Sequence, residues 1–164
     1  PVLMSRSCMK ISTSSSITIP RPRDEVFAFA CRNDTFERHL GPRGPVAGVS
    51  NVDFFEGHSL SVGSKRRIAL TDGSVLEEVI LDYSPPTRHR YRWTTGLKGP
   101  FALLVRSGTG CWDFTDVPGG TQVDWGYTFE LKSPLAYPLA LLIMPLFKGW
   151  LTQSLESIRG ELAS

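Results

Sequence analysis

Three side chains of this chain are candidates for acid–base chemistry: Glu77, His89 and Tyr127. Each lies in a segment of alternating apolar and polar residues, and its place in the alternation puts it on the apolar, inward-facing side. Burial of a carboxyl group raises its pKa, a histidine titrates near neutrality, and a phenol can donate a hydrogen bond. If the protein is an enzyme, these three are its predicted catalytic residues.

The same positions also have structural explanations. Glu77 can pair with an arginine on a neighbouring strand, and His89 can cap the sheet edge beside Pro86. Tryptophans at inward positions can fill a core rather than contact a ligand. Residue type and alternation therefore leave chemistry and structure open as alternatives.

Aromatic side chains dominate this inward-facing surface. Residues 121–131 alternate throughout, and the segments 88–97 and 101–116 follow the same rule around their tryptophans. Arg106 joins the surface unless a bulge at 107–110 resets the alternation. A mainly apolar lining with few polar groups is typical of small-molecule sites. The predicted ligand-binding residues are Tyr91, Trp93, Arg106, Trp112, Trp125, Phe129, Tyr137, Leu141 and Met144.

The elements that position these residues follow from turn signals and periodicity. A strand over 10–19 is followed by two short helices, the first opened by Pro22 and the second capped by Asn33 or Asp34. Asp72-Gly73 is among the turn signals between the later strands, and it favours antiparallel hairpins. The predicted later strands cover 47–56, 64–70, 74–83, 88–97, 101–116 and 121–131.

One long helix is predicted from 134 to 163, after the capping residue Ser133. Pro145 removes a backbone donor in mid-helix, so a bend is expected there. The first half of the helix is apolar nearly all round, whereas the second half is amphipathic. One face of the first half is therefore expected to meet a ligand, a partner subunit or a lipid surface.

Composition restricts the classes of function. The chain is 41% hydrophobic and 21% charged with a net charge of +2, which is typical of a globular protein and gives no indication of nucleic-acid binding. Three scattered cysteines indicate reduced thiols and a cytoplasmic location. No residues have metal-ligand spacing or form a dinucleotide fingerprint, so no cofactor and no metal are predicted. Residues 1–9 are predicted to be a disordered leader, with Met9 as an alternative start, and 10–164 a single domain.

Three stretches resemble a known superfamily. They are ITIPRPRDEVF at 17–27, DYSPPTRHRYRW at 82–93 and PGGTQVDW at 118–125. These stretches and their order resemble those of the helix-grip superfamily (SRPBCC). Its members include steroidogenic-acute-regulatory-related lipid-transfer domains, plant pathogenesis-related allergens and bacterial polyketide cyclase/dehydrase-like proteins. This resemblance implies an α+β fold in which a seven-stranded antiparallel sheet wraps around a long C-terminal helix.

Two main functions remain open, because the superfamily contains both enzymes and carriers. The first is a cofactor-independent cyclase or dehydratase that folds a hydrophobic substrate in a cavity between sheet and helix. The second is a non-catalytic carrier or sensor of a lipid, isoprenoid or quinone. A protein-interaction module is a third, less favoured function, and the aromatic lining argues against it. A transient membrane or partner contact through the apolar start of the last helix, and a monomer or homodimer, are compatible with both main functions.

Overall fold

Seven antiparallel strands form one sheet in the computed structural model, which describes residues 8–164. From β2 to β7 each strand pairs with the next one along the chain, and β1 pairs with β7. The strand order is therefore β1-β7-β6-β5-β4-β3-β2. Such a series of hairpins is what the turn signals predict. The strands are β1 (Lys10–Ile19), β2 (Val49–Glu56), β3 (Lys65–Leu70), β4 (Val75–Ser84), β5 (Arg88–Thr95), β6 (Val105–Val117) and β7 (Gly120–Leu131).

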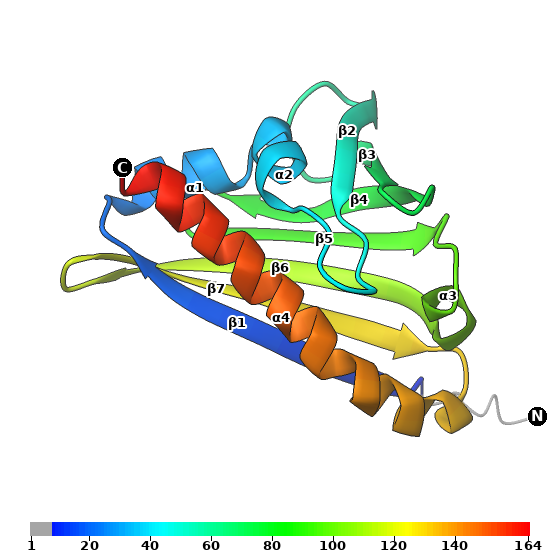
Figure 1. The fold of residues 1–164 in the computed structure, drawn as a ribbon. Coiled ribbons are helices and arrows are strands. Elements are labelled where there is room, and N and C mark those ends of the chain that lie inside the picture. The colour runs from blue at the N-terminus through cyan, green and yellow to red at the C-terminus, as the bar shows by residue number, and fades with distance from the viewer. Residues whose placement is uncertain (1–7) are drawn as a thin grey trace, which may run out of the picture.

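Helices cover one face of this sheet. The longest, α4 (Tyr137–Leu162), lies diagonally across the concave face, with α1 (Arg23–Ala30) and α2 (Asn33–His39) near its C-terminal end (Figure 1). A 3-10 turn, η1 (Pro134–Ala136), precedes α4, and the Ser133 hydroxyl accepts a hydrogen bond from the Leu135 amide as its cap. The predicted fold class, an α+β helix-grip fold with two short helices after the first strand, is confirmed.

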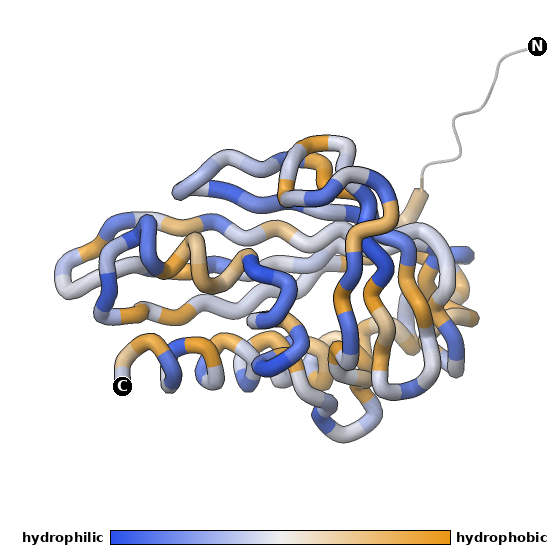
Figure 2. The backbone as a smooth tube through the Cα atoms, turned by 90° about the horizontal axis from the view of Figure 1, so that it is seen from above, coloured by the Kyte–Doolittle hydropathy of each residue, from blue (hydrophilic) through white to orange (hydrophobic). Residues whose placement is uncertain are grey.

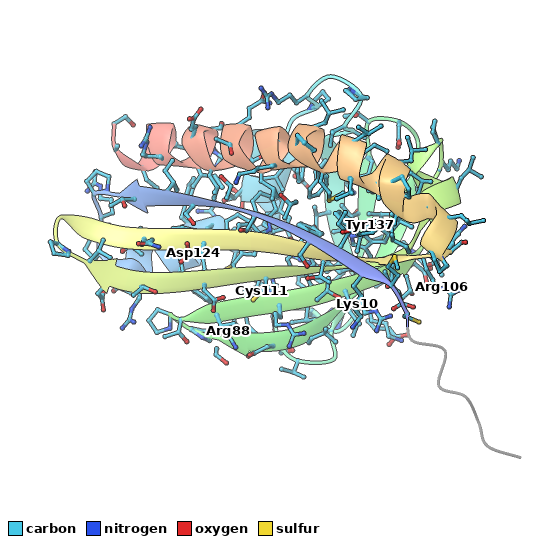
Figure 3. The ribbon with its side chains drawn as sticks, turned by 90° about the horizontal axis from the view of Figure 1, so that it is seen from below. Lys10, Arg88, Arg106, Cys111, Asp124 and Tyr137 are labelled. Carbon is cyan, nitrogen blue, oxygen red and sulfur yellow. The ribbon has the colours of Figure 1, made fainter. Side chains whose placement is uncertain are left out.

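Two predicted segments differ in detail. Residues 101–104, predicted as the start of a strand, form the short helix α3 (Phe101–Leu104), because the chain turns at Gly99-Pro100 before β6 begins. The helix α4 runs through Pro145 without interruption, and Figure 3 shows its axis bending in the N-terminal half. By length and composition alone Pro134–Leu162 could span a membrane, but here its buried side packs on the sheet.

The core lies between α4 and the sheet, and it is rich in aromatic residues. Two glycines of β6 make room for two of them. A Cβ at Gly110 would lie 2.4 Å from Cζ of Tyr91, and one at Gly108 would lie 2.4 Å from Cζ2 of Trp93. Tyr91 and Trp93 belong to β5, where they pair with Gly110 and Gly108 of β6. Each ring therefore covers the glycine that its own residue pairs with.

The two halves of α4 differ in hydropathy (Figure 2). In the C-terminal half orange and blue alternate along the tube, and the apolar positions Leu151, Leu155 and Ile158 are buried. In the N-terminal half several leucines are exposed, among them Leu142 with 73% of its surface accessible. The proposed leader falls largely in residues 1–7, outside the described residues, so it stays a prediction.

Candidate ligand-binding cavity

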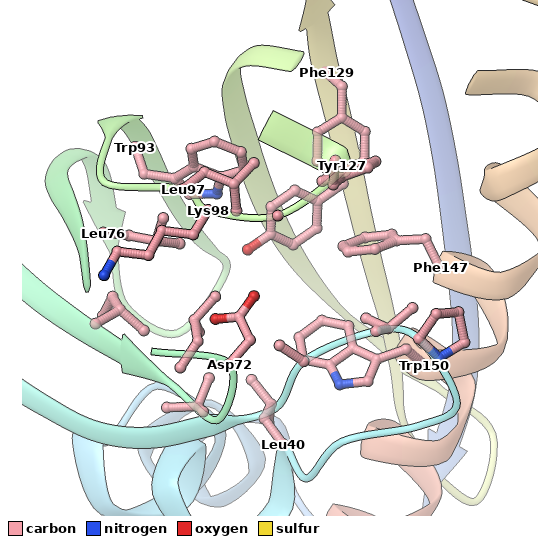
Figure 4. Close-up of a pocket in the computed structure, with 18 of the residues that line it drawn as sticks. Leu40, Asp72, Leu76, Trp93, Leu97, Lys98, Tyr127, Phe129, Phe147 and Trp150 are labelled. Carbon is pink, nitrogen blue, oxygen red and sulfur yellow. The ribbon is translucent and has the colours of Figure 1, made fainter. Parts of the chain in front are cut away.

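A cavity of about 260 Å³ lies between the sheet and the N-terminal half of α4 (Figure 4). Its floor comes from β3, β4, β5 and β7, and one wall from α4. Loops 41–48 and 96–100 form much of the rim. The lining residues are Phe36, Leu40, Pro45, Val46, Ala47, Val49, Ile68, Leu70, Asp72, Leu76, Glu78, Trp93, Leu97, Lys98, Gly99, Pro100, Phe101, Tyr127, Phe129, Ile143, Leu146, Phe147 and Trp150.

Large apolar side chains make up most of the wall. From α4, Ile143, Leu146, Phe147 and Trp150 face the cavity, at the three- and four-residue spacing that places side chains on one helix face. Phe147 packs edge-on against Phe129 of β7, with 4.9 Å between the ring centroids. This contact joins sheet and helix along one side of the cavity, so the space beside it is bounded rather than open on both sides.

Charged side chains lie at the rim. Asp72, in the turn between β3 and β4, and Lys98, in the loop after β5, are both exposed and both border the cavity. The loop 41–48 is held to the helix because the indole Nε1 of Trp150 donates a hydrogen bond to the Gly41 carbonyl oxygen, 2.8 Å away. The rim is therefore polar in part, and this hydrogen bond holds the loop 41–48 against α4.

A hydrogen-bonded cluster of aromatic residues lies beneath the cavity. The hydroxyl of Tyr91 is 3.0 Å from that of Tyr127, and it accepts hydrogen bonds from Nε1 of Trp125 at 3.2 Å and of Trp112 at 3.4 Å. Burial raises the pKa of both tyrosines, so both stay protonated. Of these four residues only Tyr127 reaches the cavity lining.

An ion pair is buried beside this aromatic cluster. Arg66 of β3 is fully buried, and Glu78 of β4 is 3% exposed. Nε of Arg66 lies 2.8 Å from Oε1 of Glu78, and a terminal guanidinium nitrogen also donates to Oε1. The remaining guanidinium nitrogen donates to the side-chain oxygen of Asn33 at 3.0 Å. Burial raises the pKa of Glu78, while the charge of Arg66 opposes the rise.

Two of the predicted ligand-binding residues, Trp93 and Phe129, line this cavity, and so does Tyr127, which was predicted as a catalytic residue. Tyr91, Trp112 and Trp125 face inward as expected, but they lie outside the lining as part of the solid core. The rings of Trp112 and Trp125 stack on each other with centroids 4.2 Å apart. For these two tryptophans the structural alternative agrees with their packing.

The inward placement of Glu77 is wrong. Glu77 is exposed, and its carboxylate lies 3.8 Å from Arg67 on the outer face of the sheet. Its neighbours Leu76, Glu78 and Ile80 face inward instead. Apolar residues occupy both faces of β4, so the alternation did not determine which face was buried.

His89 is inward as predicted but is sealed in the core. Its ring packs against Tyr83 and Tyr91, with ring centroids 5.8 and 5.2 Å away. Neither ring nitrogen makes a hydrogen bond to any described residue. Burial lowers the pKa of His89 to about 3, and the positive charge of Arg66 acts in the same direction. His89 does not border the cavity, so a catalytic role there has no geometric support.

The inward placement of Arg106 is also wrong. Its side chain is 58% exposed and lies 3.8 Å from Glu130 on the outer face. The register between β6 and β7 shifts between Val105 and Ser107, so the irregularity falls before the predicted bulge at 107–110. This shift turns Arg106 away from the core.

On α4 the predicted face is rotated from the observed one. Tyr137 and Leu141 are exposed, and Met144 is buried without bordering the cavity. A helix that is apolar on all sides gives no phase for its buried face. Reasoning from the sequence also missed Glu78 and Trp150. An arginine among the inward positions of β3 was the available signal for Glu78, because a buried arginine requires a nearby acid.

Comparison with solved structures supports the fold. Ara h 8.0201 is 15% identical with a TM-score of 0.68, over 94% of this chain and 99% of that one. Protein MLL2253 from Mesorhizobium loti is 16% identical with a TM-score of 0.66, over 93% and 96%. The di-domain ARO/CYC protein BexL, of the BE-7585A biosynthetic pathway, is 22% identical with a TM-score of 0.67, over 94% of this chain but only 50% of its own.

Sequence comparison gives a consistent result. No curated protein matches the chain. The family model described as polyketide cyclase / dehydrase and lipid transport matches residues 10–163, nearly the whole chain. The chain therefore belongs to the polyketide cyclase / dehydrase and lipid transport family, within the helix-grip superfamily suggested by its sequence motifs.

Proposed function

We propose that the protein binds a hydrophobic ring compound in the cavity between sheet and α4, as a polyketide cyclase/dehydratase-like protein. The observation that carries this proposal is the cavity itself, whose lining is mainly aliphatic and aromatic with a few polar groups. Membership of the family and the likeness to a di-domain ARO/CYC protein support it.

Tyr127 and Glu78 are the cavity-lining groups suited to the chemistry of a cyclase. In an intramolecular aldol condensation a carbon–carbon bond forms between an α-carbon and a carbonyl carbon, and water then leaves. The Tyr127 hydroxyl would donate to the carbonyl oxygen as it gains charge. Glu78, whose pKa burial raises, would accept the proton lost from the α-carbon. The apolar walls would hold the chain folded and exclude water.

A carrier of a lipid, isoprenoid or quinone is the second candidate function. The exposed leucines of η1 and of the first turns of α4 favour it, with Leu135 of η1 89% and Leu142 of α4 73% accessible. No charged residue occurs between Lys132 and Lys148, so an apolar surface with a lysine at each end borders the cavity wall. This combination suits an anionic lipid surface, from which a carrier would load. A cytoplasmic location, the absence of a cofactor or metal, and a monomeric or dimeric state stay predictions.

Blocking the cavity tests ligand binding directly. Ala47 lines the rim, and a tryptophan there would fill the opening, whereas Ala102 in α3 is also half-buried but lies outside the lining. We expect Ala47→Trp to abolish binding of 1-anilinonaphthalene-8-sulfonate to the folded protein and Ala102→Trp to preserve it. Native mass spectrometry of the freshly purified protein would show a bound mass that only Ala47→Trp loses. Equal binding by both variants would place the ligand elsewhere.

An assay of turnover distinguishes the two candidate functions. Incubation with a linear poly-β-ketone thioester should give a product lighter by one water for each condensation if the protein is a cyclase. Tyr127→Phe should then lower the rate of this mass loss while binding remains. A carrier would bind the compound and return it unchanged.

Membrane contact is tested with vesicles. The carrier function predicts binding to phosphatidylcholine vesicles with about a third phosphatidylserine, and loss of binding in Leu142→Glu. The matched change Val62→Glu, at a residue 67% exposed outside this region, should leave binding intact. If Leu142→Glu instead converts a dimer to a monomer, the surface is covered by a second copy of the chain.

A further inference from the structure

The hydrogen-bonded cluster beneath the cavity fixes the direction in which Tyr127 donates. An indole N–H can only donate, and a tyrosine hydroxyl has one hydrogen and two lone pairs. Trp112 and Trp125 both donate to the hydroxyl of Tyr91. Both lone pairs of Tyr91 are thereby occupied, so the hydrogen of Tyr91 must point to its third neighbour, the hydroxyl of Tyr127.

Tyr127 consequently accepts from Tyr91, and its own hydrogen remains available. No other described residue makes a hydrogen bond with the Tyr127 hydroxyl. Tyr127 borders the cavity, and Figure 4 shows its hydroxyl pointing toward the middle of the surrounding side chains. The cavity is therefore supplied with a hydrogen-bond donor whose direction is set by residues outside the lining.

Glu78 supplies the complementary group. Of the three hydrogen bonds that Arg66 donates, two go to Oε1 of Glu78 and the third to Asn33, and Oε2 of Glu78 has no hydrogen-bond partner among residues 8–164. Oε2 is not among the sealed polar atoms of the core, and Glu78 borders the cavity. A carboxylate oxygen can only accept. A ligand hydroxyl would satisfy this oxygen, whereas a ligand carboxylate would be repelled by it.

We propose that the cavity selects neutral ring compounds that carry both a carbonyl oxygen, which accepts from Tyr127, and a hydroxyl group, which donates to Glu78. This inference rests on the proposed function and specifies its ligand class. Hydroxylated aromatic ketones have this chemistry, and free fatty acids and plain hydrocarbons lack it.

Four bicyclic compounds of similar size test the two contacts separately: tetralin, 1-tetralone, 6-methoxy-1-tetralone and 6-hydroxy-1-tetralone. Their dissociation constants can be measured by quenching of tryptophan fluorescence, since Trp93 and Trp150 line the cavity. We expect 1-tetralone to bind about three- to tenfold more tightly than tetralin, as for one buried hydrogen bond. We expect 6-hydroxy-1-tetralone to gain a similar factor over its methyl ether, which cannot donate to Glu78.

Tyr127→Phe removes the donor and should cancel the preference for 1-tetralone over tetralin, while the preference for hydroxyl over methoxy persists. Tyr83→Phe is the matched control, because Tyr83 lies at the other end of the core beside Phe27 and outside the cavity. Equal binding of all four compounds to the wild-type protein would overturn the inference and leave the hydrophobic-ligand function standing. If none of them binds and Ala47→Trp changes nothing, the proposed function itself fails.

Discussion

The concave face of the sheet has a filled end and a hollow end, although the same strands supply aromatic side chains to both. At the filled end Trp112 stacks on Trp125, and Phe114 packs against Phe27 of α1 at 5.0 Å between centroids. At the hollow end Trp93 and Phe129 face a cavity instead. The strand residues are of the same kind, so what differs is the opposing layer. Helix α1 packs on β6 and β7 at the filled end, and loops form much of the rim at the hollow end.

Truncation of side chains on β4 should show the largest difference between the ends. Ile80 is 1% exposed in the solid core, and we expect Ile80→Ala to lower the free energy of unfolding by about 3–4 kcal/mol. Leu76 lies on the same face of the strand but borders the cavity, so Leu76→Ala should cost about 1–2 kcal/mol because fewer contacts are lost. Urea denaturation measures both. Equal losses would mean that the cavity is closed in solution.

Adding a methyl group tests the same contrast from the opposite direction. In Gly110→Ala the new Cβ meets the Tyr91 ring, which cannot move because its hydroxyl holds three partners, so we expect a loss of about 2–3 kcal/mol. In Gly108→Ala the Trp93 ring can shift into the cavity, which should cost less stability but weaken binding of 6-hydroxy-1-tetralone.

Gly126→Ala is the matched control for both changes. Its added Cβ lies 3.6 Å from the nearest atom, an ordinary contact, so little change in the urea midpoint is expected. A loss at Gly108→Ala as large as that at Gly110→Ala would contradict the mobility assigned to Trp93.

His89, in the filled end, should make stability depend on pH. Its pKa is about 3 in the folded protein, against about 6.5 when unfolded, so only the unfolded chain takes up the proton between these values. The stabilisation is fully present above pH 6.5 and is lost as pH falls toward 3, at up to about 1.4 kcal/mol per pH unit. We expect His89→Phe to reduce this slope between pH 6.5 and 5 in urea titrations. An unchanged slope would show that water reaches the ring.

The smallest effect is expected on the outer face. Glu77 is exposed and 3.8 Å from Arg67, so Glu77→Gln should change the free energy of unfolding by less than about 0.5 kcal/mol. It should also leave binding of the bicyclic ketones unaltered. A larger effect on binding would restore Glu77 as a site residue.

The sequence predicts the buried face of some elements better than that of others, for a physical reason. On β7 every second residue from Thr121 to Leu131 is apolar or small and is buried, and the intervening residues are mainly polar, so its parity could be assigned. On β4 and at the start of α4 apolar residues face both ways, and the pattern contains no phase. There the buried face depends on partners distant in sequence, such as Arg66 for Glu78. A cavity also depends on where the opposing loops and helix leave space unfilled. The alternation of residues along one strand contains no information about that space.

The loops at the rim of the cavity can change in sequence more freely than the strands and the helix that form its floor and wall. Strands and helix supply the floor and one wall, and their residues are tied to the core by pairing and packing. The loops 41–48 and 96–100 supply much of the opening, and many of their residues are exposed. Insertions or exchanges in these two loops could reshape the opening while the sheet keeps its register. Descendants of one ancestral chain could thus acquire new ligands by changing loop length, while retaining Tyr127, Glu78 and the network that orients them.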